Sequence, residues 1–179
     1  MVAQQFWGKI NLEAAYALCY FTKGGKMQHL MHQFKYKGIQ KIGDLMGNIA
    51  GEQLSKNSIF NTVDIIIPVP LHKSRFRKRG YNQSACFAEG LAQKLNVPVD
   101  ENNLVRTRAT ETQTHRSRFL RFENMQQVFT LINPEALINK HVLLVDDVVT
   151  TGSTLEACGA ELLKVEGLKL SIATIACAE

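Results

Sequence analysis

The decisive stretch of this chain, residues 142–155, reads Val142-Leu143-Leu144-Val145-Asp146-Asp147-Val148-Val149-Thr150-Thr151-Gly152-Ser153-Thr154-Leu155. Its first four residues are apolar, which is typical of a strand buried on both faces. Asp146 and Asp147 follow at the carboxyl end of that strand, and residues 150–154 form a turn rich in glycine and hydroxyl groups. Apolar residues then recur at helical spacing from Leu155 onward, so the stretch predicts a strand, a polar turn and a helix.

The turn suits a phosphate group. Small residues let successive backbone N–H groups point into one concavity, and the following helix adds its dipole and unpaired N–H groups. Hydroxyl donors come from Thr150, Thr151, Ser153 and Thr154. The adjacent carboxylates cannot bind phosphate, but they can accept hydrogen bonds from sugar hydroxyls or help to hold a hydrated Mg²⁺. The run therefore predicts a sugar-phosphate site, with ribose 5-phosphate as the natural ligand.

A simpler interpretation remains open, in which the two acids only end a strand and Ser153 only caps a helix. Two other phosphate motifs are excluded. The run has no Gly-Lys-Ser/Thr ending, as a P-loop would, and no Gly-x-Gly-x-x-Gly dinucleotide fingerprint.

Residues 142–155 resemble the phosphoribosyl pyrophosphate (PRPP) motif of type I phosphoribosyltransferases. The resemblance implies that Asp146 and Asp147 are ribose ligands and hold Mg²⁺, directly or through water or substrate. It implies a 5-phosphate loop made of Val148, Thr150, Thr151, Gly152, Ser153 and Thr154. It also implies a type I phosphoribosyltransferase fold of the α/β class, in which helices flank a mainly parallel sheet and a small N-terminal hood covers it.

The composition is that of a soluble globular domain. Among 179 residues, 45% are apolar and 21% are charged, and no apolar run approaches the roughly 20 residues of a membrane span. We see no secretory signal, and the four cysteines are scattered without a Cys-x-x-Cys pair, which favours buried thiols in a reducing cytoplasm. The net charge of +5 suits an anionic ligand, either a polyphosphate or nucleic acid.

Residues 1–61 are expected to form a hood or cap on a core of residues 62–179. Residues 12–21 could be a strand, and apolar spacing predicts helices near 27–34 and 42–49. His29 and His32 could suggest a metal, although surface histidines are favoured. The segment 35–38, Lys-Tyr-Lys-Gly, either complements a helix dipole or lies near the substrate pocket.

A second buried strand is predicted at residues 63–69, followed by a basic loop at 71–80 that holds five Lys or Arg within seven positions. Ligands of open α/β sheets bind outside the carboxyl ends of the strands, so this loop is well placed for an anion. It could also be a solvated charge run or a single-stranded nucleic-acid patch, because Phe76 lies among the cations. Residues 81–83 then begin a helix.

Residues 104–129 are rich in arginine and threonine, which indicates a long loop that could close over a reactive sugar as a lid. Strands are expected at 128–131 and 170–177. Strands therefore alternate with helices, which predicts an α/β domain with a mainly parallel sheet.

Further pieces resemble the ComF family of competence-associated phosphoribosyltransferase-like proteins. They are residues 34–38 (Phe-Lys-Tyr-Lys-Gly), 68–72 (Pro-Val-Pro-Leu-His) and 79–83 (Arg-Gly-Tyr-Asn-Gln). The resemblance implies a pyrophosphate loop of Pro70, Leu71, His72 and Lys73. It implies a flexible loop that carries Arg106, Arg108, Thr110, Gln113, Arg121 and Asn124. Catalytic roles then fall to Asp146, Asp147, Lys73 and Arg108.

Two features depart from the ComF pattern. The cysteine-rich zinc-binding segment with which these proteins usually begin is not seen, so no zinc is expected in this chain. Arg116 stands where an apolar residue is expected, which leaves the register of the loop less certain.

Two functions fit these observations. In the first, a cytoplasmic, Mg²⁺-dependent transferase moves the phosphoribosyl group of PRPP to a nitrogen nucleophile such as a nucleobase. In the second, the protein binds single-stranded DNA in DNA uptake, and PRPP is a regulatory ligand or is no longer bound. The acceptor and the oligomeric state, including a homodimer, stay open.

Overall fold

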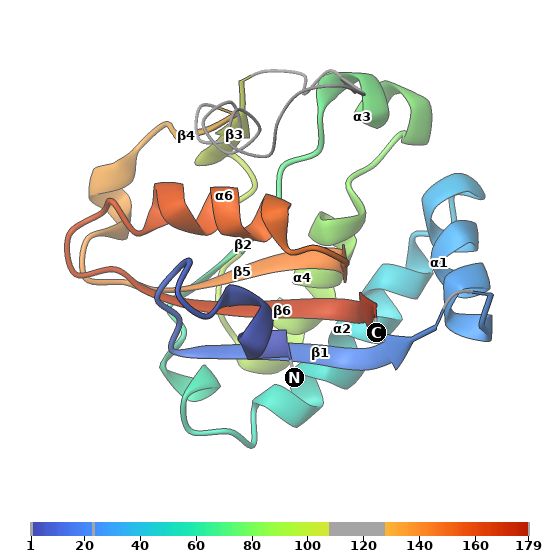
Figure 1. Ribbon diagram of the computed structural model, residues 1–179, viewed down its shortest axis with the longest axis horizontal. Coiled ribbons are helices and arrows are strands. Elements are labelled where there is room, and N and C mark those ends of the chain that lie inside the picture. Colours follow the sequence, from blue (N-terminus) through green and yellow to red (C-terminus); the bar gives the residue numbers. More distant parts are fainter. Residues whose placement is uncertain (1, 23, 108–127, 179) are drawn as a thin grey trace.

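The computed structural model describes residues 2–22, 24–107 and 128–178 (Figure 1). In this part of the chain, four strands form a parallel sheet in the order β1-β6-β5-β2. The strands are β1 (Ala14–Phe21), β2 (Ile65–Pro68), β5 (His141–Val149) and β6 (Lys169–Ala178). The α/β fold with a mainly parallel sheet, expected from the resemblance to type I phosphoribosyltransferases, is confirmed.

Strand β5 is buried on both faces, as its apolar run predicted. Val142 and Leu144 pack into one hydrophobic cluster, whereas Leu143 and Val145 pack into the other. The strand extends to Val149, so the acid pair lies within it rather than after its end. The predicted strand was too short because the two carboxylates interrupt the apolar pattern in the sequence. The hydrogen-bonded pairing of β5 with β6 nevertheless continues through these residues to Val149.

Helices cover both faces of the sheet (Figure 1). Helix α6 (Ser153–Leu162) packs on one face, and α2 (Lys41–Leu54) and α4 (Gln83–Leu95) pack on the other. Helix α1 (Lys26–Tyr36) lies beyond the carboxyl ends of the strands. The face-covering helices anchor the sheet, and α1 is placed at the edge where ligands of such sheets bind.

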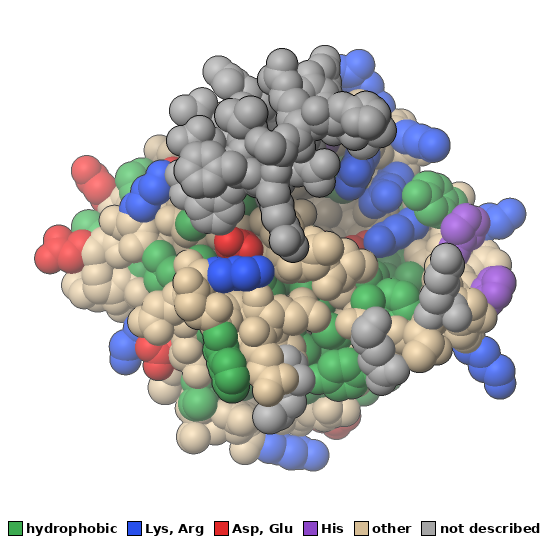
Figure 2. Space-filling view, in the orientation of Figure 1, with side chains coloured by type: hydrophobic (Ala, Val, Ile, Leu, Met, Phe, Trp, Pro, Cys, Tyr) green, Lys and Arg blue, Asp and Glu red, His purple; other side chains and the backbone are tan. Residues whose placement is uncertain are grey.

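Residues 73–79 form helix α3 (Lys73–Arg79), so the expectation of a basic loop at 71–80 is wrong for this part. The His72 side chain accepts the backbone N–H of Ser74 and begins the helix, and Gly80 ends it with a φ of 81°. Phe76, its one apolar residue, is half exposed, and no residue of the helix is buried. The sequence therefore has no apolar periodicity from which this helix could be predicted. Figure 2 shows Lys and Arg side chains gathered over α3.

The arginine-rich region begins as a strand rather than a loop. β3 (Leu104–Arg106) pairs antiparallel with β4 (Phe129–Leu131), the latter close to the strand expected at 128–131. Only Leu104 of β3 is buried, so three residues gave too little pattern to identify it. Most of the expected loop, residues 108–127, lies outside the described residues.

The first 61 residues contribute to the sheet as well as to its edge. β1 is an edge strand of the parallel sheet, and α2 packs on α4. The division into a hood or cap at 1–61 and a core at 62–179 stays a prediction. Short 3₁₀ helices lie at η1 (Val2–Phe6), η2 (Phe60–Thr62) and η3 (Pro134–Leu137). No helix in the described part of the chain has the length and apolar character needed to cross a bilayer.

Candidate functional site

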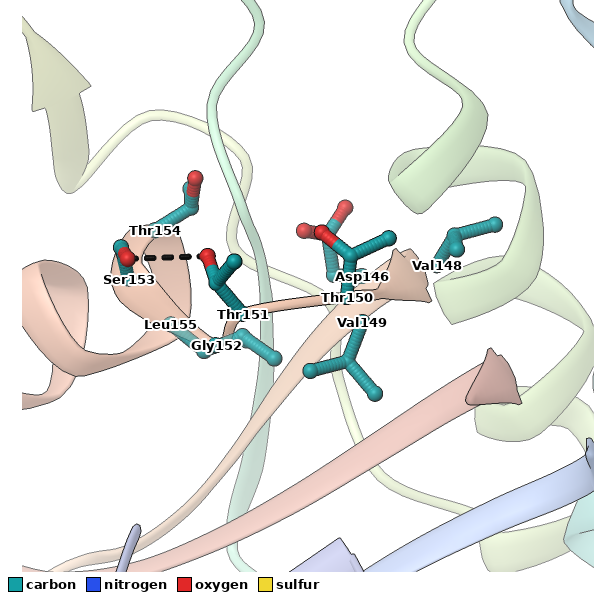
Figure 3. A pocket seen from close by; sticks show the side chains of 9 residues that line it. All are labelled: Asp146, Val148, Val149, Thr150, Thr151, Gly152, Ser153, Thr154 and Leu155. Carbon is teal, nitrogen blue, oxygen red and sulfur yellow. Dashed lines mark hydrogen bonds between the residues drawn. The ribbon is translucent and has the colours of Figure 1, made fainter. Parts of the chain in front are cut away.

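A pocket opens where β5 ends and α6 begins (Figure 3). Its lining consists of Asp146, Val148, Val149, Thr150, Thr151, Gly152, Ser153, Thr154 and Leu155. The fold thus gathers the carboxylate of Asp146 and every expected residue of the 5-phosphate loop around one hollow. Backbone N–H groups, hydroxyl groups and a carboxylate are therefore available within a single site.

The turn is built by Gly152, which has a φ of 75° and is the N-cap of α6. No side chain among the described residues caps this helix, so Ser153 is its first residue and not its cap. The first N–H groups of α6 therefore have no side-chain acceptor and can serve an anion. The hydroxyl groups of Thr151 and Ser153 lie 2.9 Å apart and face each other (Figure 3).

The N-terminal helix η1 packs against this turn through Phe6. Phe6 is buried, and its ring carbon Cε1 lies 3.1 Å from the position that a Cβ on Gly152 would take. A side chain at position 152 would therefore meet both the ring and an unfavourable φ. Phe6 is distant in sequence and carries no motif, so sequence reasoning missed it.

Asp146 lies at the pocket and is held by two hydrogen bonds. Its Oδ1 accepts the hydroxyl of Ser84 at 2.8 Å and the backbone N–H of Asp147 at 2.8 Å. Burial of the carboxyl, and then the charge of Asp147, raise the pKa of Asp146 to about 7, although both hydrogen bonds and Lys35 oppose the shift. The side chain remains reachable from the pocket, so a ligand hydroxyl can meet it.

Asp147 forms an ion pair with Lys35 of α1. Lys35 Nζ lies 2.9 Å from Asp147 Oδ2, and the two side chains are 24% and 11% exposed. The segment at residues 35–38 thus reaches the acid pair, as one of its two interpretations proposed. A cation near a helix C-terminus could equally complement the dipole, but the Lys35 ammonium is directed to Asp147.

The start of α4 joins the two strand ends. Asn82 is the N-cap of α4, where its Oδ1 accepts the backbone N–H of Ser84 at 3.2 Å, and its Nδ2 donates to the Val69 carbonyl at 3.1 Å. This arrangement places Ser84 against Asp146. Residues 81–83 were expected to begin a helix, and the 79–83 block was part of the ComF resemblance, but nothing in the pattern marked Ser84.

The expected pyrophosphate loop does not line the pocket. Residues 70–73 are absent from its lining, Lys73 is exposed, and His72 caps α3. Their proposed role therefore depends on a ligand that extends beyond the pocket.

Arg106 of the expected flexible loop lies partly buried, with its guanidinium carbon 5.4 Å from the ring centre of Phe129. Burial lowers the pKa of Arg106, and the charge of Arg75 acts in the same direction, whereas Asp146 opposes it. The other loop candidates lie outside the described residues; they are Arg108, Thr110, Gln113, Arg121 and Asn124.

Asp146 and Asp147 are the metal-ligand candidates. Among the described residues, no group of three or more His, Cys, Asp or Glu could hold an ion, and this includes His29 and His32. Two carboxylates fit Mg²⁺, which takes oxygen ligands and usually keeps several waters while it binds substrate phosphates. The site therefore fits a Mg²⁺ ion that arrives with a phosphorylated ligand better than an ion caged by protein alone.

Comparisons with known proteins identify the family of this chain. Residues 81–178 match the family model described as "Phosphoribosyl transferase domain". The chain is 34% identical over 138 residues to DNA utilization protein YhgH of Salmonella typhimurium, an alignment that covers 75% of this chain and 60% of that protein.

Two relatives carry competence names. Competence protein F of Haemophilus influenzae is 38% identical over 103 residues, which are 57% of this chain and 45% of that protein. Competence protein ComFC of Bacillus subtilis is 26% identical over 147 residues, which are 80% of this chain and 56% of that protein. The chain thus spans 60% or less of the length of these three relatives.

Proposed function

Because the chain belongs to the phosphoribosyl transferase domain family, and within it to the ComF-type proteins, we propose that it is a PRPP-binding phosphoribosyltransferase. It transfers the 5-phosphoribosyl group of PRPP to a nitrogen nucleophile of nucleobase type and releases pyrophosphate.

The observation that carries the proposal is that a donor-rich turn and the Asp146 carboxylate line one pocket. The turn at 150–154 offers N–H and hydroxyl donors to a 5-phosphate, and Asp146 offers acceptors to ribose hydroxyls. Asp147, the next residue of β5, would add a second carboxylate beside the pocket. A phosphate site alone would not need the acids, and a metal site alone would not need the donors. A ribose phosphate uses both.

In the proposed reaction, the bond between the ribose anomeric carbon and pyrophosphate breaks while a nitrogen lone pair forms the new bond. The chain would fix the sugar at both ends, which removes much of the entropic barrier. Lys73, Arg75 and Arg106 would oppose the negative charge gathering on pyrophosphate. Mg²⁺ held with the ligand at Asp146 and Asp147 would supply further charge neutralisation there.

The test is release of pyrophosphate from PRPP and Mg²⁺ in the presence of a panel of nucleobases. The wild type should release pyrophosphate with one acceptor, and Asp146→Asn/Asp147→Asn should lower the rate at least about a hundredfold, because two charge-assisted ribose contacts are lost. Lys140→Ala, an exposed change at the amino end of β5, is the matched control. Tight PRPP binding without consumption of any acceptor would contradict catalysis.

A second candidate function is binding of single-stranded DNA, and helix α3 favours it. Five of its seven residues are Lys or Arg, six of the seven positions are exposed, and the Phe76 ring is 50% exposed among them. Cations that follow a phosphate backbone and an aromatic ring that stacks on bases are what such binding requires. The names of the relatives, DNA utilization and competence proteins, agree with this candidate.

The second candidate is tested with a labelled oligonucleotide at several salt concentrations. Affinity should fall steeply with salt, and Arg75→Ala/Arg77→Ala should reduce the slope of log K against log salt by about 1.4, since each phosphate contact contributes about 0.7 for single strands. Lys140→Ala/Lys169→Ala, at the amino ends of β5 and β6, should leave it unchanged. An unchanged slope in the α3 variant would exclude α3 as the contact surface.

A further inference from the structure

We propose that Lys35 is a positioning residue of the sugar-phosphate site, which holds the Asp147 carboxylate in place to receive ribose hydroxyls. The inference rests on the proposed function, because it assigns Asp147 to the ribose. It gives helix α1, which lies far from the PRPP-like stretch in sequence, a direct part in the site.

The contact itself is short and largely shielded from solvent. Lys35 Nζ lies 2.9 Å from Asp147 Oδ2, and the carboxylate side chain is only 11% exposed. Among the described residues, no other cation forms an ion pair with either acid. Lys35 is therefore the described side chain that fixes the orientation of Asp147.

The segment around Lys35 is anchored on both sides. Phe34 is fully buried, and its carbonyl accepts a hydrogen bond from the Tyr81 hydroxyl. The centre of the Tyr36 ring lies 4.8 Å from the centre of the His32 ring and 5.4 Å from the guanidinium carbon of Arg79. These contacts hold the end of α1 in place, so Lys35 reaches Asp147 from a preformed position.

The ion pair leaves part of the carboxylate free. An ionised carboxylate has two oxygens and about four lone-pair sites, and Lys35 uses Oδ2. The remaining lone pairs can accept a sugar hydroxyl without a search through side-chain rotamers. Such preorganisation lowers the entropy lost on binding and strengthens the contact with the ligand.

Lys37 provides a contrast on the same segment. It is exposed, makes no ion pair with a described residue, and carries the same charge two positions away. Replacing Lys37 thus changes the net charge of this region as much as replacing Lys35 does. Only the replacement of Lys35 releases Asp147.

The experiment measures the affinity of the protein for ribose 5-phosphate and for its 2-deoxy and 3-deoxy analogues by calorimetry. All three probes carry the same charge, so the ratio of their affinities reports the hydroxyl contacts and cancels general electrostatics. In the wild type, loss of at least one hydroxyl should weaken binding about tenfold, as expected for a hydrogen bond to a charged group. In Lys35→Met this preference should fall to about threefold or less.

Lys35→Arg and Lys37→Met should keep the preference of the wild type, and Lys35→Gln serves as a second variant if Lys35→Met folds poorly. A preference that persists in Lys35→Met or Lys35→Gln would overturn the role of Lys35 while the proposed function stands. A preference lost equally in Lys37→Met would also overturn it, because the effect would then not depend on the contact between Lys35 and Asp147. Failure of the wild type to bind ribose 5-phosphate would remove the proposed function and this inference together.

Discussion

Asp146 is placed where its charge is costly in the absence of a ligand. Burial and the neighbouring Asp147 raise its pKa to about 7, from an ordinary value of 3.8. Between these values the folded state binds more protons than the unfolded state, so the free energy of unfolding decreases as the pH rises from about 4 to about 7. Such local destabilisation is common where a carboxylate is kept for a ligand.

Asp146→Asn should therefore stabilise the unliganded protein at pH 8 by roughly 1–3 kcal/mol, and have much less effect at pH 4. The amide oxygen can still accept the Ser84 hydroxyl and the Asp147 N–H, so only the charge is removed. Urea unfolding of both proteins at the two pH values measures the difference. Equal or lower stability of the variant at pH 8 would show that the Asp146 charge is not destabilising.

His141 stands at the opposite, amino end of β5 in a buried network. The Thr62 hydroxyl donates to the Ile59 carbonyl, so the His141 Nδ1–H donates to the Thr62 oxygen at 2.7 Å. The neutral ring then accepts the Ser171 hydroxyl at Nε2, 2.9 Å away. Burial lowers the pKa of His141, because the charged form of the ring is disfavoured away from water.

Acid should destabilise the protein partly through His141. Below an unfolded-state pKa of 6.5, the unfolded chain takes up a proton that the buried ring refuses, so the free energy of unfolding decreases as the pH falls. The difference in this free energy between the wild type and His141→Gln should change between pH 7.5 and pH 5, as measured by urea unfolding. As a control, replacing the exposed His29 of α1 by Gln should leave the difference in free energy of unfolding from the wild type the same at both pH values. If the difference for His141→Gln were also the same at both pH values, His141 would not be a source of the acid sensitivity.

At the scale of elements, α2 and α4 cross so closely that glycine is required. A Cβ on Gly90 would lie 2.3 Å from the Asp44 carbonyl oxygen, and one on Gly47 would lie 2.4 Å from the Phe87 carbonyl oxygen. Both obstacles are backbone atoms, which cannot move aside cheaply. This crossing covers the face of the sheet beneath the acid pair and fixes the axis of α4, whose start carries Ser84.

Gly90→Ala should destabilise the protein by about 2–4 kcal/mol, although alanine favours a helix over glycine by about 1 kcal/mol. Thermal or urea unfolding measures the change. Glu89→Ala, at the neighbouring exposed position of the same helix, should stay within about 0.5 kcal/mol of the wild type. Stabilisation by Gly90→Ala would mean that the helices are free to move apart.

Sequence reasoning located the elements with strong local patterns. Strand β5 followed by α6 was predicted from one run, because an apolar strand, two acids and a glycine turn leave few alternatives. Helix α3 was missed, since its side chains face solvent and leave no apolar period. Strand β3 was missed because three residues cannot show alternation. Both errors concern elements whose stability comes from caps or cross-strand pairing rather than from a buried stripe.

At the scale of the whole molecule, the site depends on segments that are distant in sequence. β5 and α6 supply the pocket lining, α1 supplies Lys35, α4 supplies Ser84, and η1 supports Gly152 through Phe6. The first two contributions follow from local patterns. The others depend on how α1, α4 and η1 pack against the sheet, which no local pattern encodes.

The central claim is that this pocket binds a phosphoribosyl group, and thermal unfolding with PRPP and Mg²⁺ tests it most directly. A ligand at about 100 times its Kd adds roughly 2.7 kcal/mol, which for a chain of this size should raise Tm by about 5–10 °C. The rise should vanish in Asp146→Asn/Asp147→Asn, with each protein compared with its own unliganded Tm. A wild type that folds well and shows no rise with PRPP and Mg²⁺ would contradict the account.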